Sequence, residues 1–217
     1  YRLLPGKKGM VDDDVTGCGN AIDATSPWIR RLSRELLVRW VEEYGIDGFR
    51  FDLASTLLRG ADGPDPASAW LADLAAEPRL DGVRLVAEPW DTGMGGYAAG
   101  RFPAPWREWN DRFRDDVRGL WRGEPARWSA VTARLTGSAD LYRHGSAPRP
   151  ATAGINAVAT HDGFTLADLV TYAHPVGGGH GQRSSNSGLE GPTADHAVTE
   201  RRGRRQRALL GTVLCAQ

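Results

Sequence analysis

The chain has 217 residues, of which 41% are hydrophobic and 25% are charged, a composition that excludes wholesale disorder and a collagen-like repeat. Its 27 Lys and Arg residues balance 27 Asp and Glu residues, so charge gives no reason to expect nucleic acid or an anionic membrane as a partner. Cys18 and Cys215 stand near opposite ends without a Cys/His cluster, which argues against a disulfide framework or a zinc site and favours a reducing, cytoplasmic compartment.

The two ends of the sequence carry no targeting signal. No apolar run approaches the roughly 18 residues of a membrane span, and the first residues lack the apolar core of a signal peptide. The chain starts without methionine and stops within an apolar run. We therefore expect it to be a segment of a longer polypeptide.

The first regular element predicted is a helix. Residues 1–25 carry Gly and Asp clusters without a sustained period, which predicts a long loop. Ser26 and Pro27 then form a helix start signal, and apolar residues recur at helical spacing after them. The helix is predicted to run to about Tyr44, because Gly45 follows as an end signal.

A short alternating segment follows at residues 46–53, with Phe49 and Phe51 on one face and Arg50 and Asp52 on the other. This alternation predicts a strand with a charged pair on one side. Beyond a Gly- and Pro-rich loop, a helix is predicted over about 67–76 and a second strand over 83–88. Helices that alternate with strands are typical of a parallel sheet.

The second half of the chain continues this alternation. Residues 106–121 have apolar spacing that fits a helix, although the first few fit a strand as well. Trp128, Val131 and Leu135 suggest another helix, and residues 153–159 form a third strand candidate.

The C-terminal third is expected to hold two helices around a long loop. A helix is predicted over 164–172, and residues 173–193 are Gly-, Ser- and His-rich without a period, as in loops that are functional or mobile. The last helix is predicted over about 195–214. Five arginines lie along it, a pattern more typical of a solvated helix face than of a nucleic-acid patch.

Three acidic residues, Asp52, Glu88 and Asp162, each stand at or just past the end of a predicted strand. At that edge of an α/β sheet ligands bind, and converging like charges need a cation, shared protons or a reaction to offset their repulsion. Metal-assisted phosphoryl transfer and glycoside hydrolysis both use such sets. The pattern alone leaves both open, although no phosphate-binding loop accompanies the acids and the eight Trp residues suit sugar rings.

Three motifs resemble a known family. Residues 47–54 (DGFRFDLA) resemble the strand-four motif of the α-amylase family of glycoside hydrolases, residues 86–90 (VAEPW) its strand-five motif, and Asn156 through His161 and Asp162 its strand-seven motif. A finer resemblance to bacterial glycogen debranching enzymes and isoamylases is carried by residues 16–20 (TGCGN), 106–117 and 189–193 (LEGPT).

The resemblance implies an α/β fold, a (β/α)₈ TIM barrel that is incomplete. All of residues 1–217 would be the central part of one catalytic barrel domain, with strands four to seven and their helices; strand six would lie at Trp106–Asn110. The other barrel strands would lie outside the chain. The half-barrel would then have two open edges with unpaired backbone and apolar surface, and we expect this segment alone to fold poorly.

The resemblance also implies a retaining glycosidase that uses no organic cofactor; no metal-binding residues are assigned, and calcium binding stays open. Asp52 would be the nucleophile and Glu88 the acid and base, about 5 Å apart, and Asp162 would stabilise the transition state. Apolar neighbours should raise the pKa of Glu88, whereas Arg50 should lower that of Asp52. Arg50 and His161 would bind the nucleophile and the sugar ring, and Trp90 could stack on glucose.

The expected substrate is a branched α-glucan such as glycogen or a limit dextrin, cut at its α-1,6 branch points. Other α-glucan specificities stay open, namely α-1,4 hydrolysis or trehalose release, because loops set specificity on a shared barrel. A non-catalytic glucan-binding remnant is the alternative from another class. One departure from the family concerns residues 173–188, where an Asn-rich stretch is usual and this chain has PVGGGHGQR.

Overall fold

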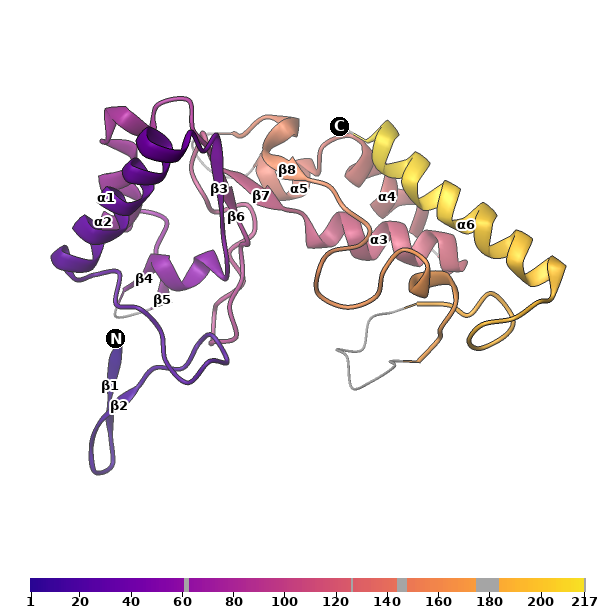
Figure 1. Cartoon of the computed structure of the whole chain (residues 1–217), viewed down its shortest axis with the longest axis horizontal. Coiled ribbons are helices and arrows are strands. Elements are labelled where there is room, and N and C mark those ends of the chain that lie inside the picture. The colour runs from indigo at the N-terminus through magenta and orange to yellow at the C-terminus, as the bar shows by residue number, and fades with distance from the viewer. Residues whose placement is uncertain (61–62, 126, 144–147, 175–183, 217) are drawn as a thin grey trace. The chain divides into compact units, whose positions relative to one another are not determined.

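The computed structural model describes residues 1–60, 63–125, 127–143, 148–174 and 184–216 (Figure 1). The chain divides into two compact units, Tyr1–Trp109 and Asn110–Gln217, called here the N-terminal unit and the C-terminal unit. The stretch PVGGGHGQR at residues 175–183, which stands where the family usually has an Asn-rich stretch, lies outside the described residues. No helix in the described ranges is long and apolar enough to cross a membrane.

A parallel sheet forms the centre of the N-terminal unit. Its strands are β3 (Gly48–Phe51), β6 (Arg84–Ala87) and β7 (Arg107–Trp109), and β6 pairs with both of its neighbours. The strands predicted over 46–53 and 83–88 are confirmed. Strand β7 confirms the strand that the resemblance implies and corrects the helical interpretation of the first residues of 106–121. These strands and their helices form part of an α/β architecture, and the described residues show no closed barrel.

Two helices accompany this sheet as predicted. Helix α1 (Pro27–Tyr44) begins at the Ser26–Pro27 signal and ends at Gly45, whose φ of 64° lies in the left-handed region that glycine adopts without strain. Helix α2 (Ala69–Ala75) begins at Ser68, whose side chain accepts from the N–H of Leu71. Between β3 and β6 the chain also forms a 3₁₀ helix, the short pair β4 (Arg59–Gly60) and β5 (Gly63–Pro64), and a 3₁₀ turn at Pro78–Leu80.

The core of the N-terminal unit lies on one face of β3. Phe51 contacts Trp70 of α2 and Trp106 at ring-centroid distances of 5.4 and 4.9 Å, and Trp106 also contacts Phe102 at 5.5 Å. Trp70, Phe102 and Trp106 are all at least 96% buried. Because Phe51 points into this cluster, the alternate residues Arg50 and Asp52 point to the opposite face.

The first 25 residues are not a plain loop. Strands β1 (Leu3–Gly6) and β2 (Gly9–Asp12) form an antiparallel hairpin. All eight of its residues are exposed, so no alternation of buried and exposed side chains marks it in the sequence. The hairpin is joined to the unit by Arg2, which binds Asp13 at 2.6 Å and donates to the carbonyls of Arg59 and Gly60.

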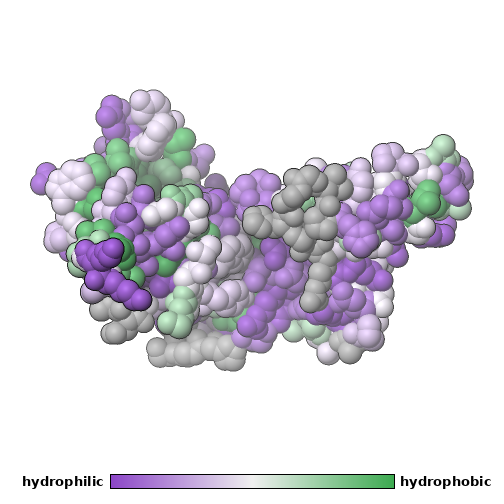
Figure 2. All heavy atoms as spheres, turned by 90° about the horizontal axis from the view of Figure 1, so that it is seen from below, coloured by the Kyte–Doolittle hydropathy of each residue, from purple (hydrophilic) through white to green (hydrophobic). Residues whose placement is uncertain are grey.

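Apolar side chains of α1 remain largely uncovered. Val38 is the one residue of this helix that is buried. Five large apolar side chains are between 39% and 66% exposed: Trp28, Leu32, Leu36, Trp40 and Tyr44. Figure 2 shows hydrophobic patches at the surface of the N-terminal unit. A groove lined by Ile29, Leu36, Trp40, Phe49 and Phe51 runs between this helix and β3. The exposed apolar surface expected at an open edge is therefore present in this unit.

The C-terminal unit consists mainly of helices. Helix α3 (Asp111–Arg122), helix α4 (Arg127–Leu135), the short α5 (Ala139–Tyr142) and helix α6 (His196–Cys215) bound it, together with the two-residue strand β8 (Gly154–Ile155). Strand β8 covers two residues of the longer strand predicted over 153–159. Phe113, Val117, Val131, Val158 and Leu209 form the buried core.

The helix predicted over 164–172 is wrong. Only a 3₁₀ turn forms there, at Asp168–Val170. The Thr165 hydroxyl donates to the Asp168 carboxylate at 2.8 Å and accepts from the N–H of the same residue at 3.2 Å. Such local bonds between side chain and backbone offer the chain an alternative to a continuous helix.

The arginines of α6 are only partly solvated. Arg202 is 8% exposed and donates to the carbonyls of Thr171, Asn186, Leu189 and Gly191. The adjacent Arg201 donates to the Ser187 carbonyl but stays exposed, and Arg205 donates to the Ser185 and Ser187 hydroxyls. The expected solvated face is wrong for the buried Arg202 and holds only in part for Arg205, and all three arginines fasten residues 184–191 to the helix.

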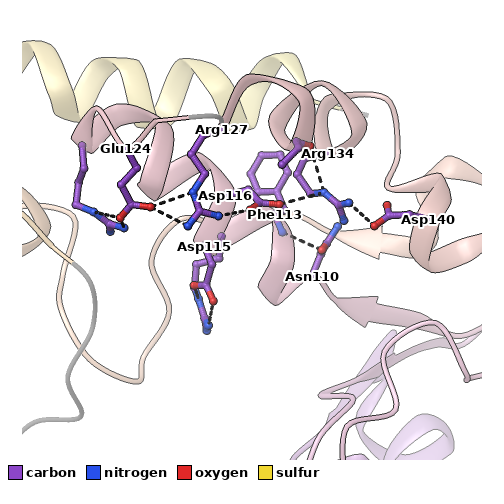
Figure 3. A network of polar contacts seen from close by, with 11 residues as sticks. Asn110, Phe113, Asp115, Asp116, Glu124, Arg127, Arg134 and Asp140 are labelled. Carbon is purple, nitrogen blue, oxygen red and sulfur yellow. Dashed lines mark hydrogen bonds and ion pairs between the residues drawn. The ribbon is translucent and has the colours of Figure 1, made fainter.

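Alternating charges link α3, α4 and α5 (Figure 3). Asp116 of α3 lies between Arg127 and Arg134 of α4, at 3.0 and 3.4 Å. Arg127 continues to Glu124, and Arg134 continues to Asp140. Hydrogen bonds from Arg122, and next from Arg127, hold the pKa of Glu124 below its ordinary value. The network fixes how the helices of this unit pack together.

Candidate active site

Asp52 and Glu88 follow the ends of neighbouring parallel strands. Phe51 pairs with Ala87 in the β3–β6 register, so the next residues, Asp52 and Glu88, stand side by side on the chain. The pairing continues past the strands, because the Glu88 N–H donates to the Phe51 carbonyl at 3.0 Å and the Ala54 N–H donates to the Glu88 carbonyl at 2.9 Å. The structure brings together these two predicted residues at the sheet edge where ligands bind in α/β proteins.

Arg50 bridges the two acids. Its Nη1 donates to Asp52 Oδ1 at 2.6 Å, and its Nη2 forms an ion pair with Glu88 Oε2 at 3.0 Å. The Asp52 side chain is 71% exposed and that of Glu88 only 4%. The sequence predicts the pairing with Asp52 through their shared strand face, but the contact with Glu88 joins Arg50 to a residue 38 positions further along the chain.

Glu88 has a polar environment, which differs from the apolar one expected. In addition to Arg50, the backbone N–H of Leu53 donates to Glu88 Oε2 at 2.7 Å. Leu53 has a φ of 41°, a left-handed conformation that is uncommon for a residue with a side chain. A backbone donor and a cation at the same oxygen thus hold the carboxyl group of Glu88 in place.

The tryptophans near the site have different roles. Trp106 belongs to the buried core. The ring of Trp109 lies under the Arg50 guanidinium, with Cζ 4.3 Å from the ring centroid. Trp90 is half-buried directly beyond Glu88 and Pro89, and its N–H donates to the Glu88 carbonyl. Its role in stacking on a sugar ring stays a prediction.

His161 and Asp162 lie in the C-terminal unit, after β8. Both side chains are exposed, at 58% and 65%, and His161 Nε2 lies 3.5 Å from Asp162 Oδ1. Asn156, at the start of the same motif, accepts from Asn110 Nδ2 at 3.1 Å. The motif is therefore anchored at its first residue and presents its last two to solvent.

Sequence reasoning missed a buried ion pair behind the site. Arg59 donates to both carboxylate oxygens of Asp91, at 2.8 and 2.6 Å, and both side chains are at least 94% buried. The hydrogen bonds that Arg59 donates to Asp91 raise the pKa of Arg59 above its ordinary value. Arg59 also donates to the carbonyl of Met94. This pair fixes the loop that follows Trp90, and no local pattern marks it because the partners are 32 residues apart.

A second missed carboxylate is Glu108, which is fully buried on the core side of β7. It accepts from the N–H groups of Gly100 and Phe102. Glu108 thus holds the loop before β7 and is not part of the catalytic pair. Within the described ranges, no group of three or more His, Cys, Asp or Glu side chains could hold a metal ion.

Curated relatives match the whole chain or nearly all of it. A glycogen operon protein GlgX homolog of Mycobacterium bovis is 44% identical over 100% of this chain and 31% of its own length. Isoamylase 3, chloroplastic, of Oryza sativa is 43% identical over 100% of the chain and 29% of its own. A glycogen debranching enzyme of Yersinia pestis is 40% identical over 94% and 32%. The chain thus spans about a third of the length of these relatives.

Solved structures of pullulanases resemble the fold of this chain. A pullulanase from Bacillus acidopullulyticus matches with a TM-score of 0.62 and 26% identity over 79% of this chain and 22% of its own. A pullulanase from Anoxybacillus sp. complexed with maltotetraose matches with a TM-score of 0.60 and 26% identity over 80% and 26%. No family model matches the chain.

Proposed function

We propose that this chain, as a homologue of the glycogen debranching enzymes and isoamylases, is the catalytic centre of a retaining hydrolase that cuts α-1,6 branch linkages in glycogen or a related α-glucan. The observation that carries the proposal is the pair Asp52 and Glu88 at adjacent strand ends, held by Arg50. Retaining glycosidases need two neighbouring carboxylic groups with different roles. The pairing of an exposed acid with a buried one supports such a division.

Asp52 is the proposed nucleophile. Its carboxylate attacks C1 of the glucose at the branch, the bond from C1 to the leaving oxygen breaks, and a covalent glycosyl ester forms. The Arg50 guanidinium at 2.6 Å directs the carboxylate. The Asp52 side chain is 71% exposed, which suits a group that must reach a polymer.

Glu88 is the proposed acid and base. It gives a proton to the leaving oxygen, and in the second half of the reaction it takes a proton from the water that attacks C1 and frees Asp52. Its Oε2 accepts from Leu53 N–H and faces Arg50, and these two contacts orient the carboxyl group.

Asp162 and His161 are proposed to bind hydroxyls of the ring being cleaved, with Asp162 stabilising the oxocarbenium-like transition state. Trp90 is proposed as a stacking surface for a neighbouring glucose. The maltotetraose complex of the similar pullulanase supports a linear or branched α-glucan as ligand. The two cysteines are free, which suits the reducing cytoplasm that we propose as its compartment.

The test uses the native protein with glycogen and amylopectin as substrates. Asp52→Asn and Glu88→Gln should each lower hydrolysis by at least about 10³-fold while the circular dichroism spectrum stays unchanged. Asp47→Asn is the matched control, because Asp47 is exposed at the opposite end of the same strand. Linear maltooligosaccharides released from branches identify α-1,6 cleavage; shortened main chains or released trehalose would identify another specificity.

The remnant hypothesis makes the opposite prediction. Glycogen would bind, no reducing ends would appear, and Asp52→Asn would change nothing. Wild-type rates in both acid variants would also overturn the proposed function.

A further inference from the structure

We propose that Trp109 is a positioning residue that holds Arg50 in the one orientation from which it serves Asp52 and Glu88 together. This inference rests on the proposed function and deepens it. It concerns a residue on a third strand, outside the motifs that carry the acids.

Strand register places Trp109 on the correct face. Ala87 pairs with Glu108 in the β6–β7 register, so the following residues, Glu88 and Trp109, are neighbours on adjacent strands. Side chains alternate along each strand. Because Glu108 points to the core side, Trp109 points to the same face as Arg50, Asp52 and Glu88.

The reach of Arg50 explains why a support is needed. Arg50 lies on β3 and Trp109 on β7, with β6 between them, which is about 9 to 10 Å of backbone spacing. The Arg50 side chain must therefore extend across β6, and on its way it passes Glu88. A long flexible side chain held out in this manner loses rotamer entropy unless its end is fixed.

The indole ring supplies that end point. The guanidinium carbon lies 4.3 Å from the centroid of the Trp109 ring, a distance at which a cation over an aromatic face is attracted. Arg50 Nε is buried and has no hydrogen-bond acceptor among the residues that the structure describes. Arg50 Nη1 donates to Asp52 Oδ1, and Nη2 forms the ion pair with Glu88 Oε2. The ring thus supports the flat face of the guanidinium and leaves its edges to the carboxylates.

The consequence is a shared dependence of both acids on Trp109. A side chain without an aromatic face at position 109 would let the guanidinium move from the plane in which it contacts Asp52 and Glu88. Both carboxylates would then lose the contact with Arg50 that holds them in place. Neighbouring groups that face the guanidinium are Asp52 from β3, Glu88 from β6 and Trp109 from β7.

The test compares Trp109→Leu with Trp109→Phe in the native protein acting on amylopectin. For Trp109→Leu we expect kcat to fall about tenfold or more while KM stays within about twofold. Trp109→Phe keeps an aromatic face and should restore most of kcat. Trp128→Leu, at a tryptophan of α4 that is 72% exposed, is the matched control and should behave as wild type.

A purely structural role would give a different result. Trp109→Leu would then lower the fraction of folded protein, and kcat per folded molecule would stay at the wild-type value. Equal impairment of Trp109→Phe and Trp109→Leu would also overturn the inference.

A second measurement separates this inference from the proposed function. In ¹H–¹⁵N spectra the Arg50 Nε–H signal, identified by its loss in Arg50→Lys, should be shifted by the ring current of Trp109. The shift should persist in Trp109→Phe and vanish in Trp109→Leu. If the native protein cleaves no glucan, the proposed function fails, and this spectrum still decides: a signal unchanged in Trp109→Leu refutes the positioning role.

Discussion

The backbone N–H of Leu53 donates to the Oε2 atom of Glu88 at 2.7 Å, which links the residue after one catalytic candidate to the side chain of the other. Leu53 reaches this position with a φ of 41°. The left-handed turn directs its N–H across to the neighbouring strand. A conformation that is costly for leucine is thus maintained where it fixes the orientation of a carboxylate.

Substitution at Leu53 should reveal that conformation. Glycine adopts a positive φ freely, whereas a β-branched side chain fits it poorly. We therefore expect Leu53→Val to be less stable than Leu53→Gly by about 1 to 3 kcal/mol in urea unfolding. If Leu53→Val were as stable as Leu53→Gly, the left-handed turn would not be a constraint on the native state.

The buried pair of Arg59 and Asp91 should dominate the stability of its loop. Asp91→Asn leaves the Arg59 guanidinium buried without a charged partner, and we expect a loss of about 3 to 5 kcal/mol in the free energy of unfolding. Glu43→Gln breaks the exposed pair with Arg39 and should cost less than about 1 kcal/mol. Similar losses in the two variants would show that burial of the Arg59 pair has no energetic weight.

Two adjacent aspartates of α3 offer a matched comparison. Asp116 joins Arg127 and Arg134 across the α3–α4 interface, whereas Asp115 binds only its chain neighbour Arg114 among the ion pairs described. Asp116→Asn should destabilise the protein by about 1 to 3 kcal/mol and Asp115→Asn by less than about 0.5 kcal/mol. Chemical denaturation of both variants under the same buffer conditions tests this order, and a reversed order would contradict it.

Acid stability should depend in part on Glu77. Hydrogen bonds from Arg79 lower the pKa of Glu77 from 4.5 to about 2. A carboxyl group whose pKa is lower in the folded state stabilises that state above its ordinary pKa, and the contribution disappears as pH falls. Between about pH 4.5 and 2, the urea midpoint of the wild type should therefore fall more steeply than that of Glu77→Gln.

The control for this pH effect is Glu200→Gln, which removes an exposed carboxylate that pairs with Arg204. Its curve should run parallel to that of the wild type. Parallel curves for wild type and Glu77→Gln would instead show that Glu77 is not the group responsible.

Local patterns predicted the elements whose residues signal them directly. Ser26, Pro27 and Gly45 mark both ends of α1, and the alternation of Phe49 and Phe51 with Arg50 and Asp52 marks β3. The hairpin of β1 and β2 escaped prediction because none of its side chains is buried. The false helix over 164–172 had helical apolar spacing, but only the 3₁₀ turn Asp168–Val170 forms there.

The two acids of the candidate site could be predicted from the sequence, but the contacts that hold them in place could not. Asp52 and Glu88 each stand beside a strand with its own sequence signal. The contacts that hold them, from Leu53 to Glu88 and from Arg50 to Trp109, join residues on different strands. A single sequence contains no register between strands, so neither contact could be derived from it.

Arg202 of α6 binds four carbonyls of the segments around residues 171 and 186–191, and this ties those segments to one rotational setting of the helix. Adjacent positions on a helix differ by about 100° of rotation, so only the correct turn of α6 presents this guanidinium to the four carbonyls. Insertion or deletion of one residue in α6 before position 202 would therefore turn the guanidinium away from all four carbonyls at once.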